Sequence, residues 1–224
     1  IVNSYEFKKS LDKIFNINSI CIYNPINKKE VLKQSKVDLK FNFFDKKSLN
    51  LINVGRCTSQ KNQILILKAV KHLNKNIPIK LLIAGRGREF SKLDYFIKQN
   101  NLSNCVKLFD FLPNPHKFIK KADVFILSSN YEGLPNVLLE AQCLKKIILS
   151  TKCPTGPKEI LMNGKAGIFF KMNNYKDLAK KIHYIKNNKT ALKRKTLVGY
   201  NNLSRFNQET NLNKYYLILK KYLI

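Results

Sequence analysis

Two glutamates in the segment NYEGLPNVLLEA are the residues best suited to chemistry. Glu132 follows the apolar run 123–129, and Glu140 lies within a predicted helix a little further on. A carboxylate in a cleft at the carboxyl end of a strand is a good acceptor for sugar hydroxyls. The plainer alternative is an acid that favours the helix dipole and one surface glutamate.

The start of that predicted helix could bind an anion. Pro135 suits the first helical turn, where a missing N–H costs nothing. The next N–H groups, those of Asn136, Val137 and Leu138, have no acceptor four residues earlier within the helix. Free N–H groups at a helix N-terminus suit a phosphate.

The segment GRCTSQKN supplies two cations directly after an apolar run. Gly55 permits a tight turn, and Arg56 and Lys61 stand five positions apart. Two cations on one strand–helix turn could straddle a diphosphate. In a chain this rich in lysine, two ordinary surface cations are the competing interpretation.

The segment AGRGREF carries a shorter glycine pattern. Gly85 and Gly87 form a GxG turn that could bring backbone N–H groups close to a ligand. The third glycine of a dinucleotide fingerprint is absent, and no acidic residue closes a later strand in the right place. The pattern therefore disfavours an NAD-binding protein.

A proline-rich loop, STKCPTGPKEI, follows a later apolar run. Pro154, Gly156 and Pro157 predict a rigid turn before a short helix whose first turn holds Glu159. Its chemistry fits a loop that lines a substrate site and a purely structural turn equally well.

Short apolar runs alternate with amphipathic segments from residue 49 onward. Strands are expected at 49–55, 79–85, 105–110, 123–129, 146–151 and 166–170, and helices at 61–76, 89–101, 116–122, 135–145, 157–162 and 175–188, with two more helices at the C-terminus. Strands alternating with helices predict an α/β, Rossmann-like, doubly wound parallel sheet with a helical C-terminus. Ligands bind such sheets at the carboxyl ends of the strands. All the segments singled out above lie at those ends.

Residues 1–48 have a different pattern. A helix is expected at about 4–15 and a strand at 18–24, ending at Pro25. Residues 41–48 are typical of a linker.

The charge of the chain needs an explanation. Among 224 residues, Lys and Arg total 42 against 14 Asp and Glu, for a formal net charge of +28. Such a balance suggests nucleic-acid binding. Only five of the basic residues are Arg, and the lysines form no block, so no specific nucleic-acid partner is expected. A solvated surface, or one that faces an anionic membrane, is the favoured interpretation.

The cysteine pattern bounds the compartment. Five cysteines occur without a CxxC pair, and the three histidines are dispersed, so the sequence predicts no metal site. Reduced thiols in the cytoplasm are the simplest expectation. No signal peptide is recognised at the start of the sequence, which begins with Ile1 and is consistent with a fragment.

Taken in order, these motifs resemble the C-terminal domain of family 4 retaining glycosyltransferases of the GT-B fold. The family's paired glutamates, with seven residues between them, are matched by Glu132 and Glu140. Its arginine and lysine, five apart, are matched by Arg56 and Lys61. Its GxG turn is matched by the two glycines of AGRGREF. The resemblance covers nearly the whole chain and implies one half of a GT-B fold.

The resemblance implies a role for each site residue. Arg56 and Lys61 would hold the donor diphosphate, and Glu132 would contact the donor sugar. Glu140 would accept hydrogen bonds from the ribose hydroxyls. The remaining donor-binding residues implied are Gly55, Gly85, Gly87, Phe111, Leu112, Asn136, Val137 and Leu138. The family transfers sugar from a nucleotide sugar with retention and generally needs no metal or other cofactor.

The resemblance also implies how the chain is divided. Residues 1–48 would be the tail of an N-terminal domain and a linker, 49–190 the nucleotide-sugar-binding domain, and 191–224 C-terminal helices. The acceptor site would lie on the N-terminal domain, so this chain is expected to bind a nucleotide or nucleotide sugar without turning it over. A C-terminal helix at about 208–223 would pack on that missing domain.

Partners and location follow as expectations of the same resemblance. The donor would be a UDP- or GDP-sugar, and the acceptor a glycan or lipid-linked glycan of bacterial surface polysaccharide synthesis. The enzyme would be cytoplasmic, with peripheral contact at the inner face of the membrane. Two alternatives stay open: a module that binds anionic surfaces or nucleic acid through charge alone, and another GT-B activity such as a nucleotide-sugar epimerase.

Overall fold

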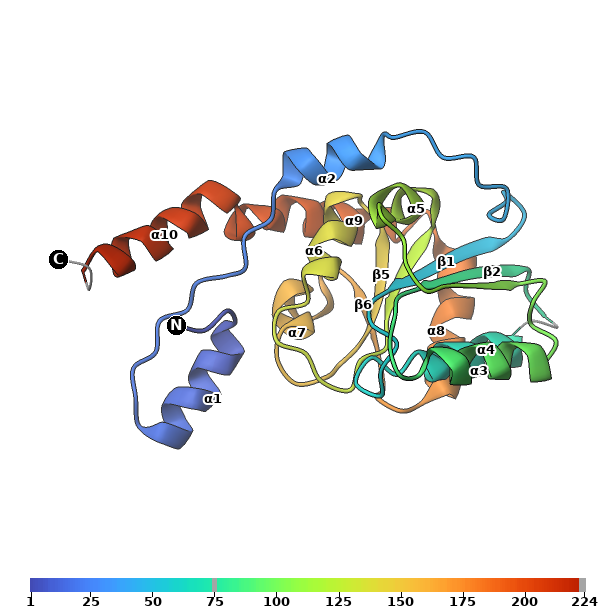
Figure 1. Ribbon diagram of the computed structural model, residues 1–224, viewed down its shortest axis with the longest axis horizontal. Helices are drawn as coiled ribbons and strands as arrows, with labels where there is room; N and C mark the ends of the chain where they lie inside the picture. Colours follow the sequence, from blue (N-terminus) through green and yellow to red (C-terminus); the bar gives the residue numbers. More distant parts are fainter. Residues whose placement is uncertain (74–75, 222–224) are drawn as a thin grey trace.

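Six parallel strands form one sheet in the order β3-β2-β1-β4-β5-β6 (Figure 1). The computed structural model describes residues 1–73 and 76–221. The strands are β1 (Leu49–Val54), β2 (Ile79–Ala84), β3 (Val106–Phe109), β4 (Val124–Leu127), β5 (Ile147–Thr151) and β6 (Ile168–Phe170). The chain winds outward from β1 in one direction and from β4 in the other, because β1 pairs with both β2 and β4. This order confirms the predicted α/β, Rossmann-like fold class.

The strands are mostly apolar because both faces of the sheet are covered. Successive residues of β1 point to opposite faces: Leu51 joins one hydrophobic core, and Ile52 joins the other. In β2, Leu81 and Leu82 divide in the same way. All four side chains are fully buried. Two cores on one sheet explain why the sequence lacks an alternating polar pattern.

Two groups of helices supply those cores. The helices are α1 (Tyr5–Phe15), α2 (Lys28–Ser35), α3 (Gln63–Leu73), α4 (Phe90–Gln99), α5 (Pro115–Lys121), α6 (Asn136–Cys143), α7 (Pro157–Ile160), α8 (Tyr175–Asn188), α9 (Lys193–Asn202) and α10 (Gln208–Lys220), with 3₁₀ turns η1 (Met162–Gly164) and η2 (Leu203–Phe206). Helices α3, α4 and α8 pack on one face, and α2, α5 and α6 pack on the other (Figure 1). Of the helix predicted at 61–76, residues 74 and 75 lie outside the described residues.

The predicted strand at 18–24 is wrong. Cys21 forms only an isolated bridge with Val2, through hydrogen bonds from Val2 N to Ile20 O and from Ile22 N to Val2 O, each 2.9 Å long. Among the described residues no neighbouring strand extends this ladder, so apolar residues alone do not make a strand here. Helix α2, which covers the sheet beside α5, was not predicted from the sequence.

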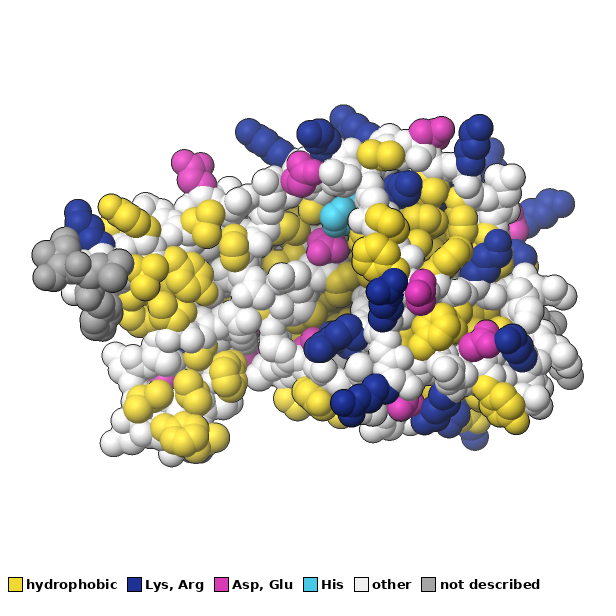
Figure 2. All heavy atoms as spheres, viewed as in Figure 1, with side chains coloured by type: hydrophobic (Ala, Val, Ile, Leu, Met, Phe, Trp, Pro, Cys, Tyr) yellow, Lys and Arg dark blue, Asp and Glu magenta, His cyan; other side chains and the backbone are white. Residues whose placement is uncertain are grey.

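Helices α1 and α10 lie apart from the sheet (Figure 1). Both keep large apolar side chains exposed: Ile14 is 71% exposed on α1, and Tyr216 is 61% exposed on α10. Yellow side chains gather on both helices in Figure 2. Of the helix expected at 208–223, the last two residues lie outside the described residues. Within the described part, its apolar face is exposed.

The described residues form neither a membrane-spanning helix nor a disulfide. Over residues 1–73 and 76–221, no helix is both long and apolar enough to cross a membrane. The five cysteines are free thiols, and four of them are buried. Nor does any group of three or more His, Cys, Asp or Glu side chains in these ranges gather as a metal site would require.

Candidate functional site

The loops after β1 and β2 touch each other through their backbones. A Cβ atom on Gly85 would lie 1.9 Å from the carbonyl oxygen of Gly55, and one on Gly87 would lie 2.1 Å from that of Cys57. Cys57 N donates to Arg86 O at 2.8 Å, and Gly85 N donates to Phe109 O at 2.9 Å. The expectation that the GxG turn presents free N–H groups is therefore wrong at Gly85. Close contact between the loops explains why glycine stands at both positions.

Lys61 and Glu132 meet across the carboxyl edge of the sheet. The distance from Lys61 Nζ to Glu132 Oε1 is 2.6 Å, and the side chains are 17% and 6% exposed. Ser129 Oγ donates to the same carboxylate oxygen at 2.6 Å. The loops after β1 and β4 thus bring together a cation and a carboxylate that are 71 residues apart in sequence. Such a pair can hold an anion and a hydroxyl side by side.

Arg56 is exposed and lines a hollow of about 320 Å³ together with Phe111 and Leu112. Neither Lys61 nor Glu132 lines this hollow. Arg86 covers Phe111, with its guanidinium carbon 5.3 Å from the ring centroid. Arg86 Nε also lies 3.6 Å from Asp110 Oδ2. The loops after β1, β2 and β3 therefore form a hollow with an aromatic wall and two cations, which suits a planar base and a phosphate.

The start of α6 presents fewer free N–H groups than the sequence predicts. Leu138 N donates to Pro135 O at 3.0 Å, so the expectation of a free N–H is wrong at Leu138. In the described part of the chain, no acceptor is found for the N–H groups of Asn136 and Val137. Asn24 Nδ2 donates to Asn136 Oδ1 at 2.9 Å, which ties the linker segment to this helix. Two N–H groups remain available for an anion.

Glu140 lines another hollow, of about 170 Å³, and has a histidine partner. Its Oε2 atom lies 3.4 Å from His116 Nε2, and the two side chains are 26% and 19% exposed. Asn136, one helical turn earlier on α6, lines the same hollow, and Glu30 of α2 lies on its wall. His116 was not predicted as a site residue, because a single histidine after Pro115 carries no motif.

The proline-rich loop after β5 packs on the Glu132 loop. Thr155 Oγ1 donates to Glu132 O, and a Cβ on Gly156 would lie 1.8 Å from Gly133 O. Glu159, at the end of this loop, accepts hydrogen bonds from Ser4 Oγ and Tyr5 N, each 2.9 Å long. Of the two interpretations of this loop, the contacts favour the structural turn. Its glutamate caps α1.

Two cysteines near the site remain thiols. Burial raises the pKa of Cys57 and of Cys153 to about 11 in each case. A thiol with so high a pKa is protonated at neutral pH and is a poor nucleophile. The chemistry of the site therefore rests on its carboxylates and cations.

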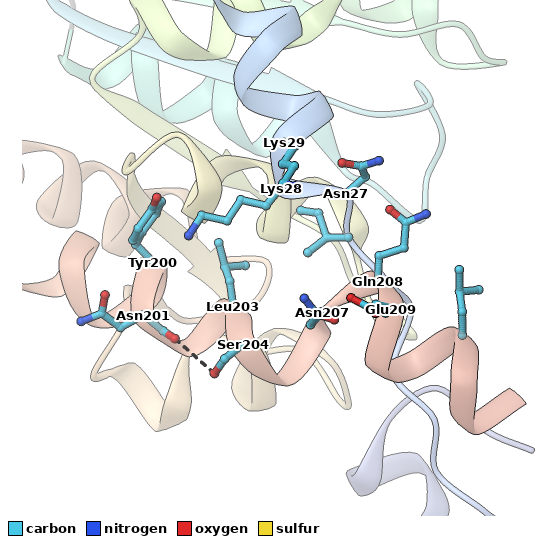
Figure 3. A pocket seen from close by; sticks show the side chains of 12 residues that line it. Asn27, Lys28, Lys29, Tyr200, Asn201, Leu203, Ser204, Asn207, Gln208 and Glu209 are labelled. Atoms are coloured by element: carbon cyan, nitrogen blue, oxygen red, sulfur yellow. Dashed lines mark hydrogen bonds between the residues drawn. The ribbon is translucent and has the colours of Figure 1, made fainter. Parts of the chain in front are cut away.

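A larger groove of about 920 Å³ lies between the start of α2 and the segment from α9 to α10 (Figure 3). Lys28 reaches across it, with Nζ 3.7 Å from the ring centroid of Tyr200. The groove shares Ile26 and Asn27 with the Glu140 hollow but contains none of the predicted site residues. Size alone therefore does not identify the site.

Comparisons with known proteins agree with this fold and these motifs. The family model described as "Glycosyl transferases group 1" matches residues 34–202. An uncharacterised glycosyltransferase from Methanocaldococcus jannaschii is 37% identical over 168 residues, which cover 72% of this chain and 41% of that protein. A Campylobacter jejuni enzyme is 32% identical over 158 residues, covering 70% of this chain and 43% of the enzyme. Its name is GalNAc-alpha-(1->4)-GalNAc-alpha-(1->3)-diNAcBac-PP-undecaprenol alpha-1,4-N-acetyl-D-galactosaminyltransferase.

Solved structures show the same fold. The Anabaena protein HepE, solved in complex with UDP-glucose, superimposes with a TM-score of 0.86 at 16% identity, over 98% of this chain and 63% of that one. The sheet and flanking helices match glycosyltransferase structures of the GT-B type. The chain spans less than half the length of the two relatives above. Because the family model covers well over half of the chain, the protein belongs to the group 1 glycosyl transferases.

Proposed function

We propose that the chain is the donor-binding half of a family 4 retaining glycosyltransferase of the GT-B fold. In this proposal Arg56 and Lys61 bind the diphosphate of a nucleotide sugar and stabilise negative charge on the leaving nucleotide. Glu132 contacts the donor sugar, and Glu140 accepts hydrogen bonds from the ribose. Phe111 and Leu112 flank the base. The N–H groups of the first α6 residues meet the sugar or phosphate.

The observation that carries the proposal is the separation of the two glutamates. Glu132 is paired with Lys61, whereas Glu140 lines a hollow to which neither Lys61 nor Glu132 belongs. The free N–H groups of Asn136 and Val137 lie between them in sequence. A carboxylate for the sugar, a cation with two N–H donors for the diphosphate, and a second carboxylate for the ribose match the groups of a nucleotide sugar.

The donor and acceptor classes follow from relatives. The Anabaena structure contains UDP-glucose, and the Campylobacter enzyme is named for an N-acetylgalactosaminyl transfer to an undecaprenol-linked glycan. These names support a UDP-hexose or UDP-N-acetylhexosamine donor, with a GDP-sugar as the other option. They also support a glycan or lipid-linked acceptor of surface polysaccharide synthesis. A hexosyltransferase of this kind would work in the cytoplasm, at the inner face of the membrane.

The net charge of +28 fits that location. Each Lys or Arg close to an anionic membrane surface adds about 1 kcal/mol of attraction. Charge of this kind needs no specific lipid site, and it accounts for lysines that touch neither the nucleotide nor the sheet.

The missing half of the enzyme would supply the acceptor site. Residues 1–48 would then be the tail of that half with its linker, 49–190 the donor domain and 191–224 the returning helices. The exposed apolar side chains of α1 and α10 support this division, because large exposed apolar patches mark interaction surfaces. Bound to donor alone, the chain would not transfer sugar.

A thermal-shift screen with UDP-, GDP- and ADP-sugars tests the proposal. A ligand at 100 times its dissociation constant stabilises the folded state by about 2.7 kcal/mol, which raises the midpoint by several degrees. One nucleotide class should stabilise the chain and the others should not. Asp94→Asn, on the far helix α4, is the matched control for loss of one carboxylate. No stabilisation by any nucleotide would refute the proposal.

Two further outcomes identify the alternatives. If Glu140→Gln is neutral while binding of DNA or anionic vesicles falls steeply with salt, the chain is an anionic-surface module. If the full enzyme converts a nucleotide sugar into an epimer without any acceptor, it is a nucleotide-sugar epimerase.

A further inference from the structure

His116 is the only side chain within ion-pair distance of Glu140 in the described part of the protein. His116 Nε2 lies 3.4 Å from Glu140 Oε2, and both side chains line the hollow of about 170 Å³. The other carboxylate oxygen, Oε1, has no hydrogen-bond partner among the described residues. One oxygen of Glu140 is thus occupied by protein, and one is left for a ligand.

Hydrogen bonds of the neighbouring residue Asn114 fix the backbone position of His116. Asn114 caps helix α5, because its Oδ1 accepts from His116 N at 3.1 Å. The Nδ2 atom of Asn114 donates to Gln34 O at 2.9 Å and to Gln34 Oε1 at 3.0 Å. Pro115, between the cap and the histidine, restricts the backbone further. Helix α2, through Gln34, therefore holds the turn that carries His116.

This series of contacts indicates that His116 has a role beyond packing. A partly buried histidine usually packs against a core, whereas His116 lines a hollow whose wall also includes Glu30. Glutamate has three side-chain torsions, so a carboxylate on a helix surface samples several orientations unless a neighbour fixes it. A contact at Oε2 restricts those orientations and leaves Oε1 without a protein partner among the described residues.

We propose that His116 is a positioning residue that holds the Glu140 carboxylate ready to accept hydrogen bonds from the ribose hydroxyls of the donor. The inference rests on the proposed function. It differs from direct recognition, because His116 acts through Glu140 and touches no part of the nucleotide. It also assigns helix α2 a role in donor binding, through the contact of Gln34 with Asn114.

Two variants and a nucleotide analogue separate a positioning role from direct contact with the nucleotide. Gln places its side-chain N–H group close to the position of histidine Nε2, whereas Asn is too short to reach it. UDP binding, measured by isothermal titration, should weaken about tenfold in His116→Asn and less than threefold in His116→Gln. 2′,3′-Dideoxy-UDP lacks the hydroxyls that Glu140 would bind, so its affinity should be the same in the wild-type protein and in both variants.

A double-mutant cycle provides the decisive comparison. In a Glu140→Gln background, His116→Asn should cause no further loss of UDP affinity. An equal loss in both backgrounds, or an equal loss for UDP and the dideoxy analogue, would show that His116 contacts the nucleotide or merely maintains the fold. Either result overturns the inference while leaving the proposed function intact.

A ligand-free measurement separates failure of the pair from failure of donor binding. The imidazole nitrogen resonances of His116, assigned with His116→Gln, should shift in Glu140→Gln and stay unchanged in Asp94→Asn. Unchanged resonances in Glu140→Gln would refute the pair whatever the nucleotide data show. If the wild-type chain binds neither UDP nor GDP, the proposed function fails and the inference falls with it.

Discussion

Lys61 Nζ lies 2.6 Å from Glu132 Oε1, and both side chains are largely buried. Without donor, the cation and the carboxylate neutralise each other at the edge of the sheet. A bound diphosphate would offer Lys61 a second anionic partner and leave Glu132 free to accept a sugar hydroxyl. The pair therefore keeps two charged groups in place that would otherwise be costly to bury.

Loss of Lys61 should destabilise the fold. Lys61→Ala leaves Glu132 charged, buried and without a counterion, so the free energy of unfolding should fall by about 3 kcal/mol. Urea denaturation measures this directly. In a Glu132→Gln background the same substitution should cost less than half as much. Equal costs in both backgrounds would show that the two side chains do not interact.

The glycine at the end of β2 should tolerate no side chain. A Cβ at Gly85 would stand 1.9 Å from Gly55 O, so Gly85→Ala must push two loops apart. We expect a loss of about 3 kcal/mol or more in unfolding free energy. Gly55→Ala is the matched control, since the nearest atoms to a Cβ there would be those of the Lys61 side chain, at 3.9 Å. Thermal unfolding of both variants should rank them far apart, and similar midpoints would refute the close contact.

Glu159 should hold α1 on the main body of the protein. It accepts hydrogen bonds from Ser4 Oγ and Tyr5 N, at the start of that helix. In Glu159→Ala, amide hydrogen exchange at Tyr5 and Glu6 should accelerate at least tenfold, because the N–H groups of these two residues lose their acceptor. Lys158→Ala, which removes an exposed ion pair with Glu6, should leave exchange nearly unchanged. Slow exchange in both variants would contradict the cap.

The end of α1 should loosen in acid. Lys8 and then Ser19 lower the pKa of Asp12 to about 2, against about 3.9 in an unfolded chain. A carboxyl group with a lowered pKa stabilises the folded state above pH 4, and this contribution is lost as the pH falls toward 2. Amide exchange at Ser19, whose N–H donates to Asp12 Oδ1 at 2.8 Å, should therefore accelerate over that range. Asp12→Asn should remove this dependence, and a pH profile that stays the same would contradict it.

The sheet could be predicted from sequence because its strands are short, mostly apolar runs. Strands β1 and β2 each end at a glycine, and the covered faces leave no polar alternation to confuse the pattern. The same rule failed at residues 18–24, which are equally apolar but have no strand ladder beside them. Helix α2 was missed because its eight residues contain only Val31 and Leu32 as large apolar side chains.

Spacing singled out the residues that we propose for the site but not how they pair. The Lys61–Glu132 contact joins residues 71 apart, and nothing in either local motif specifies it. His116 carries no motif at all, because its place beside Glu140 depends on how α5 packs against α6. The glycines of the GxG turn were recognised, yet their backbone contact with the neighbouring loop depends on strand order, which local sequence does not specify.

Isothermal titration of UDP and GDP into the wild-type protein and its Glu140→Gln variant tests the central claim most directly. Binding of a nucleotide through Glu140 predicts a measurable dissociation constant for one of the two in the wild-type protein. A rise of about tenfold or more is expected in the variant, corresponding to about 1.4 kcal/mol. Asp94→Asn should bind like the wild-type protein. Equal affinity of the wild-type and Glu140→Gln proteins, or no binding by either, would contradict the assignment of this site as the donor site.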